Sequence, residues 1–369
     1  DAYARASQSK TGVLDTSKLH TYKYNEDLFK KVTVIPDGKN HGMIFVLDWS
    51  GSMGNEIFAT VKQLLNLTAF CKKVQIPFEV YAFTNEWYAA RRAIENVQCF
   101  SNNDYYNKPN LEEGKIYIDK MHFNLVNFVS SRSNSRDYEN MCLNLYRETY
   151  QYKYYTNYQS TIGLGLSGTP LNEAIISMNY IVPEFKKQND LQKVNVCILT
   201  DGEACNSSYG VRKYNDHKDE FFTSHKRLDD NVVLRDRKTG YVYPNFSGAW
   251  GGDSNIFIKQ LRDRHPDVNV IGFRILGGKD LSNFVFTYGS SEKFPDVQRQ
   301  WKKERSAIIP FPKSFTALFA IHNNSMEETA EFDVDSGAKK SDITRAFKKM
   351  LVKKSNNKKI LSSFIDYIS

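Results

Sequence analysis

Continuous apolar runs and helical apolar stripes alternate along much of the chain. Residues 43–47 are all apolar, as in a strand that is covered on both faces. In the next segment Ile57, Val61 and Leu64 recur at three- and four-residue spacing, which predicts an amphipathic helix. Residues 78–83 then predict a second strand. A strand, a helix and another strand in succession imply a right-handed crossover and a parallel sheet.

The same alternation resumes in the second half of the chain. Helices are expected at residues 171–185 and 255–264, and strands at 194–199, 268–275 and 315–321. Strands that alternate with helices predict an α/β fold, in which a doubly wound, mostly parallel sheet is flanked by helices. Such folds bind their ligands at the carboxyl ends of the strands.

Two long segments interrupt this alternation. In residues 84–166, which are rich in Tyr and Asn, helices are predicted at 118–129 and 137–150. In residues 203–250 a β-hairpin is predicted at 232–243. We interpret both segments as insertions into one domain.

The predicted organisation therefore has three parts. An N-terminal extension occupies residues 1–42, the α/β domain with its two insertions occupies 43–321, and a basic helical segment occupies 322–369. From Lys339 onward, basic residues far outnumber acidic ones. This tail is either a solvated pair of helices or a contact for an acidic partner. Nucleic acid is not expected as a partner, because no aromatic RNA-binding signature accompanies the basic residues.

Composition places the chain among soluble globular proteins. It has 369 residues, of which 41% are apolar and 25% charged, with a net charge of +8. No apolar run reaches the roughly 18 residues that span a bilayer, and the N-terminus has no signal-peptide pattern. The five cysteines lack a CxxC pair, which favours reduced thiols in the cytoplasm. The abundance of Asn, Lys, Tyr, Phe and Ile is typical of AT-rich coding, as in a phage acting in the host cytoplasm.

Carboxylate and hydroxyl side chains gather at the predicted ends of strands. Asp48, Ser50 and Ser52 follow the first apolar run in an Asp-x-Ser-x-Ser arrangement and can point the same way where the loop leaves the strand. Asp201, in Thr-Asp-Gly-Glu, follows a later predicted strand, and Thr169, in Ser-Gly-Thr-Pro, precedes a predicted helix. Because hard divalent cations prefer oxygen ligands, the sequence predicts a metal site at this edge of the sheet.

These three segments resemble the metal-ion-dependent adhesion site of von Willebrand factor A domains. The resemblance covers about residues 43–321 and leaves the two insertions unexplained. The Gly-Thr-Pro-Leu form of the second loop resembles intracellular members, such as subunits of magnesium and cobalt chelatases and partners of MoxR-type AAA+ ATPases. The resemblance implies that one Mg²⁺ or Mn²⁺ is held by Asp48, Ser50, Ser52, Thr169 and Asp201.

Three neighbours of this site have two interpretations each. Thr169 and Pro170 predict a helix N-cap followed by proline at the first helical position, and the same hydroxyl can also face the cation. Trp49 lies either on the rim of the site, as a docking residue, or packed beneath the loop. Glu203 is interpreted as a solvated loop residue, with contact to a metal-bound water as the alternative.

The expected site leaves one coordination position for an external ligand. Two carboxylates neutralise a divalent cation, but hydroxyls donate weakly and Mg²⁺ usually retains waters. An Asp or Glu of a partner protein can replace one water. The resemblance and this chemistry together predict a metal-dependent receptor for an acidic residue.

Sequence signatures of catalysis are absent. The chain has no HExxH motif and no GxxxxGK[ST] phosphate loop, and no nucleophile pattern stands out. His217 and His225, near Asp216, match no usual zinc spacing. We therefore predict a non-enzymatic interaction module that serves as an adaptor for a MoxR-type AAA+ ATPase. The alternatives are a non-catalytic subunit of a chelatase-like complex and a structural or virion-associated binding protein; no membrane partner is expected.

Overall fold

The computed structural model describes two compact units, residues 1–40 and 41–369. In the first unit, strands β1 (Ser7–Leu14) and β2 (Phe29–Val34) pair antiparallel. All other elements belong to the second unit. The described residues are 7–14, 29–34, 40–85, 111–118, 123–154, 161, 163–217, 219–244, 252–277 and 279–323.

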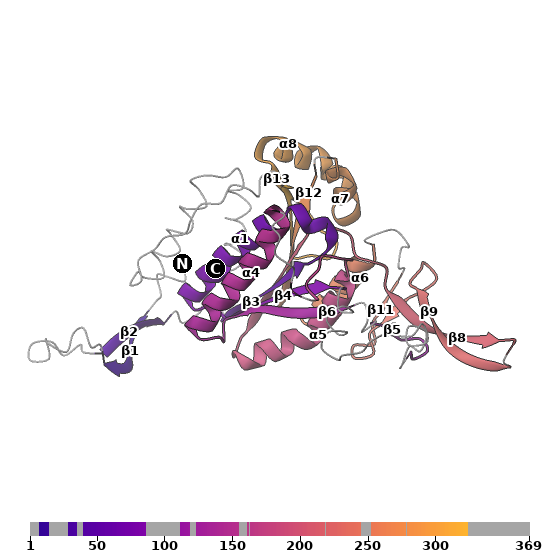
Figure 1. Ribbon diagram of the computed structural model, residues 1–369, viewed down its shortest axis with the longest axis horizontal. Helices are drawn as coiled ribbons and strands as arrows, with labels where there is room; N and C mark the ends of the chain where they lie inside the picture. Colours follow the sequence, from indigo (N-terminus) through magenta and orange to yellow (C-terminus); the bar gives the residue numbers. More distant parts are fainter. Residues whose placement is uncertain are drawn as a thin grey trace, which may run out of the picture. The chain divides into compact units, whose positions relative to one another are not determined.

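A seven-stranded sheet forms the centre of the second unit, in the order β13-β14-β12-β7-β3-β4-β6 (Figure 1). The edge strands β6 (Asn124–Ser130) and β13 (Ser306–Ile308) run antiparallel to their neighbours. This order confirms the predicted doubly wound, mostly parallel sheet. The inner, parallel strands are β3 (His41–Asp48), β4 (Phe78–Thr84), β7 (Lys193–Thr200), β12 (Val268–Leu276) and β14 (Ala317–His322).

Helices cover both faces of this sheet, which explains why its inner strands are apolar throughout. In β3, Met43, Phe45 and Leu47 belong to the core that contains α1. Ile44 and Val46, on the opposite face, belong to the core that contains α5 and α6. The helices are α1 (Ile57–Val74), α4 (Ser135–Tyr154), α5 (Leu171–Gln188), α6 (Gly252–Arg264), α7 (Leu281–Tyr288) and α8 (Phe294–Glu304), with the 3-10 turns η3 (Gly51–Asn55) and η4 (Ser291–Lys293).

The sheet changes its winding direction at β3. From β3 the chain crosses through α1 to β4 on one side, and it later places β7 on the other side of β3. The carboxyl ends of β3 and β7 therefore flank the point at which open α/β sheets bind ligands. Asp48 is the last residue of β3, and Thr200 is the last residue of β7.

The first insertion corrects one prediction and confirms another. The helix predicted at 118–129 is wrong, because β6 occupies much of this segment and pairs antiparallel with β4. Its sequence, Asn-Leu-Val-Asn-Phe-Val-Ser, is rich in residues that suit a pleated surface, and pairing with a neighbouring strand decides the outcome. The helix predicted at 137–150 is confirmed by α4.

The two insertions meet in a separate three-stranded sheet. Strand β5 (Ile116–Tyr117), from the first insertion, pairs with β8 (Ser208–Asn215), from the second. Strand β8 also pairs with β9 (Glu220–Arg227), and the two form a long hairpin (Figure 1). The predicted hairpin at 232–243 is confirmed by β10 (Leu234–Arg235) and β11 (Val242–Tyr243).

Other sequence predictions have mixed outcomes. Cys71 and Cys197 are buried, and the described cysteines are free thiols, as expected. The described residues include no helix that is both long and apolar enough to cross a membrane. The basic helices predicted from Lys339 onward lie outside the described residues.

Candidate metal centre

Asp48 and Thr200 lie side by side at the ends of adjacent parallel strands. Asp48 is fully buried, and the Thr200 hydroxyl donates a hydrogen bond to its Oδ2. Its other oxygen, Oδ1, is buried and has no hydrogen-bond partner among the described residues. A buried, unpaired carboxylate oxygen is costly, and a bound cation or a proton would remove that cost. Thr200 was not among the predicted site residues, although it directly precedes Asp201.

The two predicted serines connect β3 to Asp201. Ser50 and Ser52 Oγ lie 3.0 Å apart, and the Ser52 hydroxyl donates to Asp201 Oδ1 at 2.8 Å. The 3-10 turn η3 begins at Gly51 and is anchored by the buried side chain of Met53. Ser50 is buried, whereas Ser52 is exposed. The Asp-x-Ser-x-Ser loop therefore runs from the interior to the surface.

Thr169 lies close to the same group of side chains. A β-carbon built on Gly202 would lie 3.6 Å from Thr169 Oγ1 and 3.5 Å from Ser52 Oγ. Both hydroxyls therefore border the backbone that follows Asp201. The structure thus brings all five predicted ligands, from three loops, into one neighbourhood.

The predicted helix cap at Thr169 is wrong. The N-cap of α5 is Pro170, the helix begins at Leu171, and no side chain caps it. Proline at the N-cap moves the helix start by one residue, so the Thr169 hydroxyl is not used for capping. The Thr169 carbonyl instead accepts a hydrogen bond from the Cys205 backbone at 2.9 Å.

Backbone contacts hold the first two loops together. The Gly51 N–H donates to the Ser167 carbonyl at 2.6 Å, and Ser50 forms a parallel bridge with Ser167. The Gly168 N–H donates to Asn85 Oδ1 at 2.6 Å, which ties this loop to the end of β4. Asn85 has no sequence pattern that marks it.

Trp49 packs beneath the loop, so its alternative placement on the rim is wrong. Its side chain is fully buried, and its indole N–H donates to the Leu164 carbonyl at 2.6 Å. The Tyr152 hydroxyl donates to the same carbonyl at 2.7 Å. Trp49 and Tyr152 together fix the segment that leads to Thr169.

Arg274 holds the loop that follows β7 and contains Asp201. This residue of β12 is buried, donates to the Gly202 carbonyl and pairs with the Glu203 carboxylate. The Tyr288 hydroxyl also donates to Glu203. Glu203 is thus a paired structural residue, and its interpretation as a solvated loop residue is wrong. Arg274 is the one cation in the apolar run predicted at 268–275, which is a signal that could have identified it.

The electrostatics of the site favour a bound cation. Burial raises the pKa of Asp48 to about 7, and the Asp201 carboxylate adds to this effect. The Thr200 and Ser50 hydroxyls and the Arg274 guanidinium act in the opposite direction. Burial also raises the pKa of Asp201, while Ser52 and Arg274 lower it. A divalent cation between the two carboxylates would offset this cost.

The donor set fits a hard cation. Two carboxylates and three hydroxyls offer only oxygen, which suits Mg²⁺ or Mn²⁺ better than zinc. The described residues contain no group of three or more His, Cys, Asp or Glu that could hold a metal. His217 and His225 are both exposed. His225 lies within β9, opposite Gly210 of β8, whereas His217 lies in the turn that precedes β9. A zinc site at His217 and His225 gains no support from this arrangement.

Comparisons with known proteins give distant likenesses. No protein-family model matches the chain, and no curated protein sequence matches it. Among solved structures, the pilus adhesin SpaC from Lactobacillus rhamnosus GG, in its open conformation, is 13% identical with a TM-score of 0.38, over 85% of this chain. The chain spans 31% of that adhesin. The vWF domain of the type V pili tip protein Mfa5 from Porphyromonas gingivalis is 9% identical with a TM-score of 0.33, over 78% of this chain and 91% of that one. The fold assignment rests on the strand order and burial described above.

Proposed function

We propose that the chain is a non-enzymatic protein-interaction module that binds one Mg²⁺ or Mn²⁺ and, through it, an Asp or Glu of a partner protein. The observation that carries this proposal is the buried Asp48 Oδ1, which has no hydrogen-bond partner among the described residues. It lies where the sheet changes direction, next to two serines and a second carboxylate. The resemblance to the metal-ion-dependent adhesion site implies a ligand set that contains these same residues.

The burial of the ligands defines the side from which a partner approaches. Asp48, Ser50 and Thr169 are buried, whereas Ser52 is exposed and Asp201 is partly exposed. The buried side chains therefore place one carboxylate and two hydroxyl groups on the inner side of the proposed cation. A bound cation would supply positive charge on the outer side, where a carboxylate can reach it.

The surrounding residues favour binding over catalysis. A hydrolytic metal site needs a base beside a metal-bound water. The side chains that brace this site are Thr200, Trp49 and Arg274, and the nearby Glu203 carboxylate is already held by Arg274 and Tyr288. We therefore expect no ATPase or peptidase activity from the isolated chain.

The identity of the partner follows from the resemblance alone. The Gly-Thr-Pro-Leu loop at residues 168–171 resembles intracellular family members, so a cytoplasmic MoxR-type AAA+ ATPase is the proposed partner. A chelatase complex and a virion component are the alternatives. Capture from the source cell with and without EDTA, followed by identification of the bound proteins, separates the three.

Calorimetry tests the metal site directly. Chelator-treated protein should bind one Mn²⁺ or Mg²⁺, and Asp201→Asn should weaken this binding strongly. Asp263→Asn, which changes a carboxylate on α6 that accepts from Tyr243, is the matched control and should bind the cation as the parent does. Equal binding by the parent and Asp201→Asn would contradict the proposed site.

A further inference from the structure

A cavity of about 800 Å³ lies where the two insertions meet. One wall is the β5 segment, with Lys115 and Ile116, and the other is the β10 segment, from Val232 to Arg237. Leu228 and Tyr209 complete the lining from the β8–β9 hairpin. This volume is typical of sites that enclose a small organic molecule.

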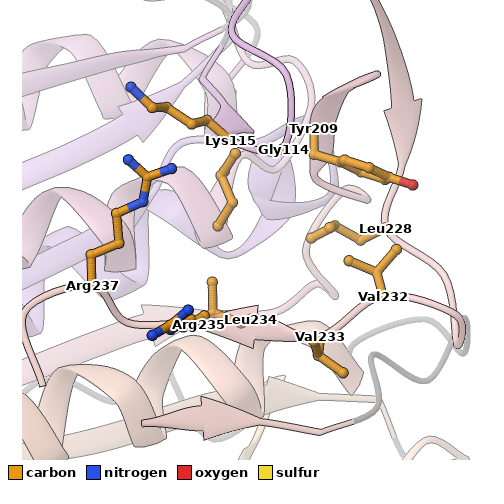
Figure 2. A pocket seen from close by; sticks show the side chains of 10 residues that line it. Gly114, Lys115, Tyr209, Leu228, Val232, Val233, Leu234, Arg235 and Arg237 are labelled. Atoms are coloured by element: carbon orange, nitrogen blue, oxygen red, sulfur yellow. The ribbon is translucent and has the colours of Figure 1, made fainter. Parts of the chain in front are cut away.

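The cavity has a charged side and an apolar side. Figure 2 shows the charged ends of Lys115, Arg235 and Arg237 toward one side. Leu228 and Val232 lie toward the other side, with Leu234 between the two groups. Among the described residues that line the cavity, none carries a carboxylate. The surface therefore suits a molecule with an apolar body and one anionic end.

Among the described residues, no hydrogen bond or ion pair holds the side chains of Arg235 and Arg237. Lys115 already pairs with Glu112, and both side chains are largely solvated. Asp236, which lies between the two arginines in the sequence, does not line the cavity: it accepts from Gln260 of α6 at 2.6 Å and from the Lys238 N–H at 2.8 Å. Arg235 and Arg237 thus flank a carboxylate that is already satisfied elsewhere.

Both walls are held in place by backbone and side-chain contacts. The Gly210 N–H donates to the Lys115 carbonyl at 3.0 Å, and the Gly114 N–H donates to the Gly210 carbonyl at 2.8 Å. A β-carbon at Gly210 would lie only 2.2 Å from the Glu112 carbonyl oxygen, so the two insertions cross in close contact. On the opposite wall, Asp236 fixes the hairpin to α6. A cavity between fixed walls is preorganised for binding.

We propose that this cavity binds a small organic carboxylate. Its apolar body lies against Leu228, Val232 and Leu234, and its carboxylate pairs with Arg237, assisted by Arg235. Planar guanidinium groups match carboxylates in geometry and charge. This binding does not depend on the proposed metal centre, since none of the five proposed metal ligands lines the cavity.

The test is a methyl NMR titration of the full chain, labelled at Ile, Leu and Val methyl groups. Sodium octanoate is the probe, and 1-octanol, of the same length without the charge, is its control. Octanoate should shift the methyl signals of Ile116, Leu228, Val232 and Leu234 in a saturable way. It should bind up to roughly fivefold more tightly than 1-octanol, as expected for one solvent-accessible ion pair.

Two variants locate the carboxylate. Arg237→Gln should lower octanoate affinity by roughly fivefold and leave 1-octanol unchanged. Lys238→Gln removes the same charge from the adjacent exposed residue, which does not line the cavity, and should change neither. EDTA should have no effect on the titration, which separates this site from the metal centre.

Three results would overturn the proposal. One is equal affinity for octanoate and 1-octanol; another is an equal loss in Arg237→Gln and Lys238→Gln. The third is the absence of a saturable shift at these four residues up to about 10 mM octanoate, where even a weak small-molecule site is occupied.

Discussion

The candidate metal centre and the cavity between the insertions both present charged side chains to a proposed ligand, but they place the charge differently. At the metal centre the charge is negative, and Asp48 is fully buried at the end of a central strand. In the cavity the charge is positive, and Arg235 and Arg237 are exposed on a hairpin. A buried charge lowers the stability of the ligand-free protein, whereas an exposed charge has little effect on it.

Because of this difference, we expect substitutions at the two sites to have different effects on binding and stability. Changes at the buried residues of the candidate metal centre, such as Asp48 and Arg274, should affect the stability of the fold, because these residues belong to core strands. Changes at Arg237 should affect binding alone. The variants below test this contrast, from the largest expected effect to the smallest.

Asp48→Asn should abolish the metal centre without unfolding the chain. We expect Mn²⁺ affinity, measured by calorimetry, to fall about hundredfold or more, because a charged ligand is lost. In the absence of cation, the variant should unfold at a temperature no lower than the parent, since the amide has the same shape and carries no buried charge. A cooperative loss of folding would instead identify Asp48 as a structural residue.

Arg274→Met should destabilise the fold by about 3 kcal/mol, because it removes a buried charged donor from Glu203 and the Gly202 carbonyl, which keep only the hydroxyls of Tyr288 and Thr200. Urea unfolding followed by circular dichroism measures this loss. The control is Arg299→Met, which removes an exposed pair with Asp296 on α8 and should cost less than about 1 kcal/mol. Similar losses in both variants would show that the Arg274 contacts are not stabilising.

Glu173→Gln should stabilise the chain at high pH. Burial raises the pKa of Glu173, in the first turn of α5, to about 7 from the ordinary 4.5. The folded state therefore holds this proton more tightly than the unfolded state, and stability falls as the pH rises from about 4.5 to about 7.

At pH 8 we expect the glutamine variant to be more stable than the parent by about 3 kcal/mol, a gain that disappears near pH 4. Thermal or urea unfolding across this range measures it. Glu184→Gln, on the exposed side of the same helix, is the control and should show no such pH dependence. A constant difference at all pH values would contradict the assignment.

Ser52→Ala should weaken cation binding by about tenfold, roughly 1.4 kcal/mol, because one neutral oxygen ligand is lost. The fold should not change, since Ser52 is exposed. Ser167→Ala, in the neighbouring loop, is the control, because its contacts with Gly51 and Ser50 use the backbone. Equal cation affinity of the two variants would remove Ser52 from the ligand set.

The sequence predicted the fold and the candidate ligands because both depend on local patterns. The apolar run at 43–47 requires burial on both faces, and Asp48 must then lie at its carboxyl end. The bracing residues Arg274 and Asn85 were missed, because they join loops that are far apart in the chain. The edge strand β6 was missed for the same reason, since its pairing with β4 outweighs its local pattern.

The position of β3 in the middle of the sheet also determines when the proposed metal ligands can come together. Thr200, whose hydroxyl contacts Asp48, follows it by 152 residues, and Asp201 comes one residue later. During synthesis on the ribosome, β3 and β4 can pair before β7 has been synthesised, so one edge of β3 is still unpaired. The first insertion and α5 must emerge before that side is covered. Contacts between segments so distant in sequence form slowly. We therefore expect binding of the proposed cation to be a late event in folding, and Mn²⁺ binding during refolding would report the docking of β7 onto β3.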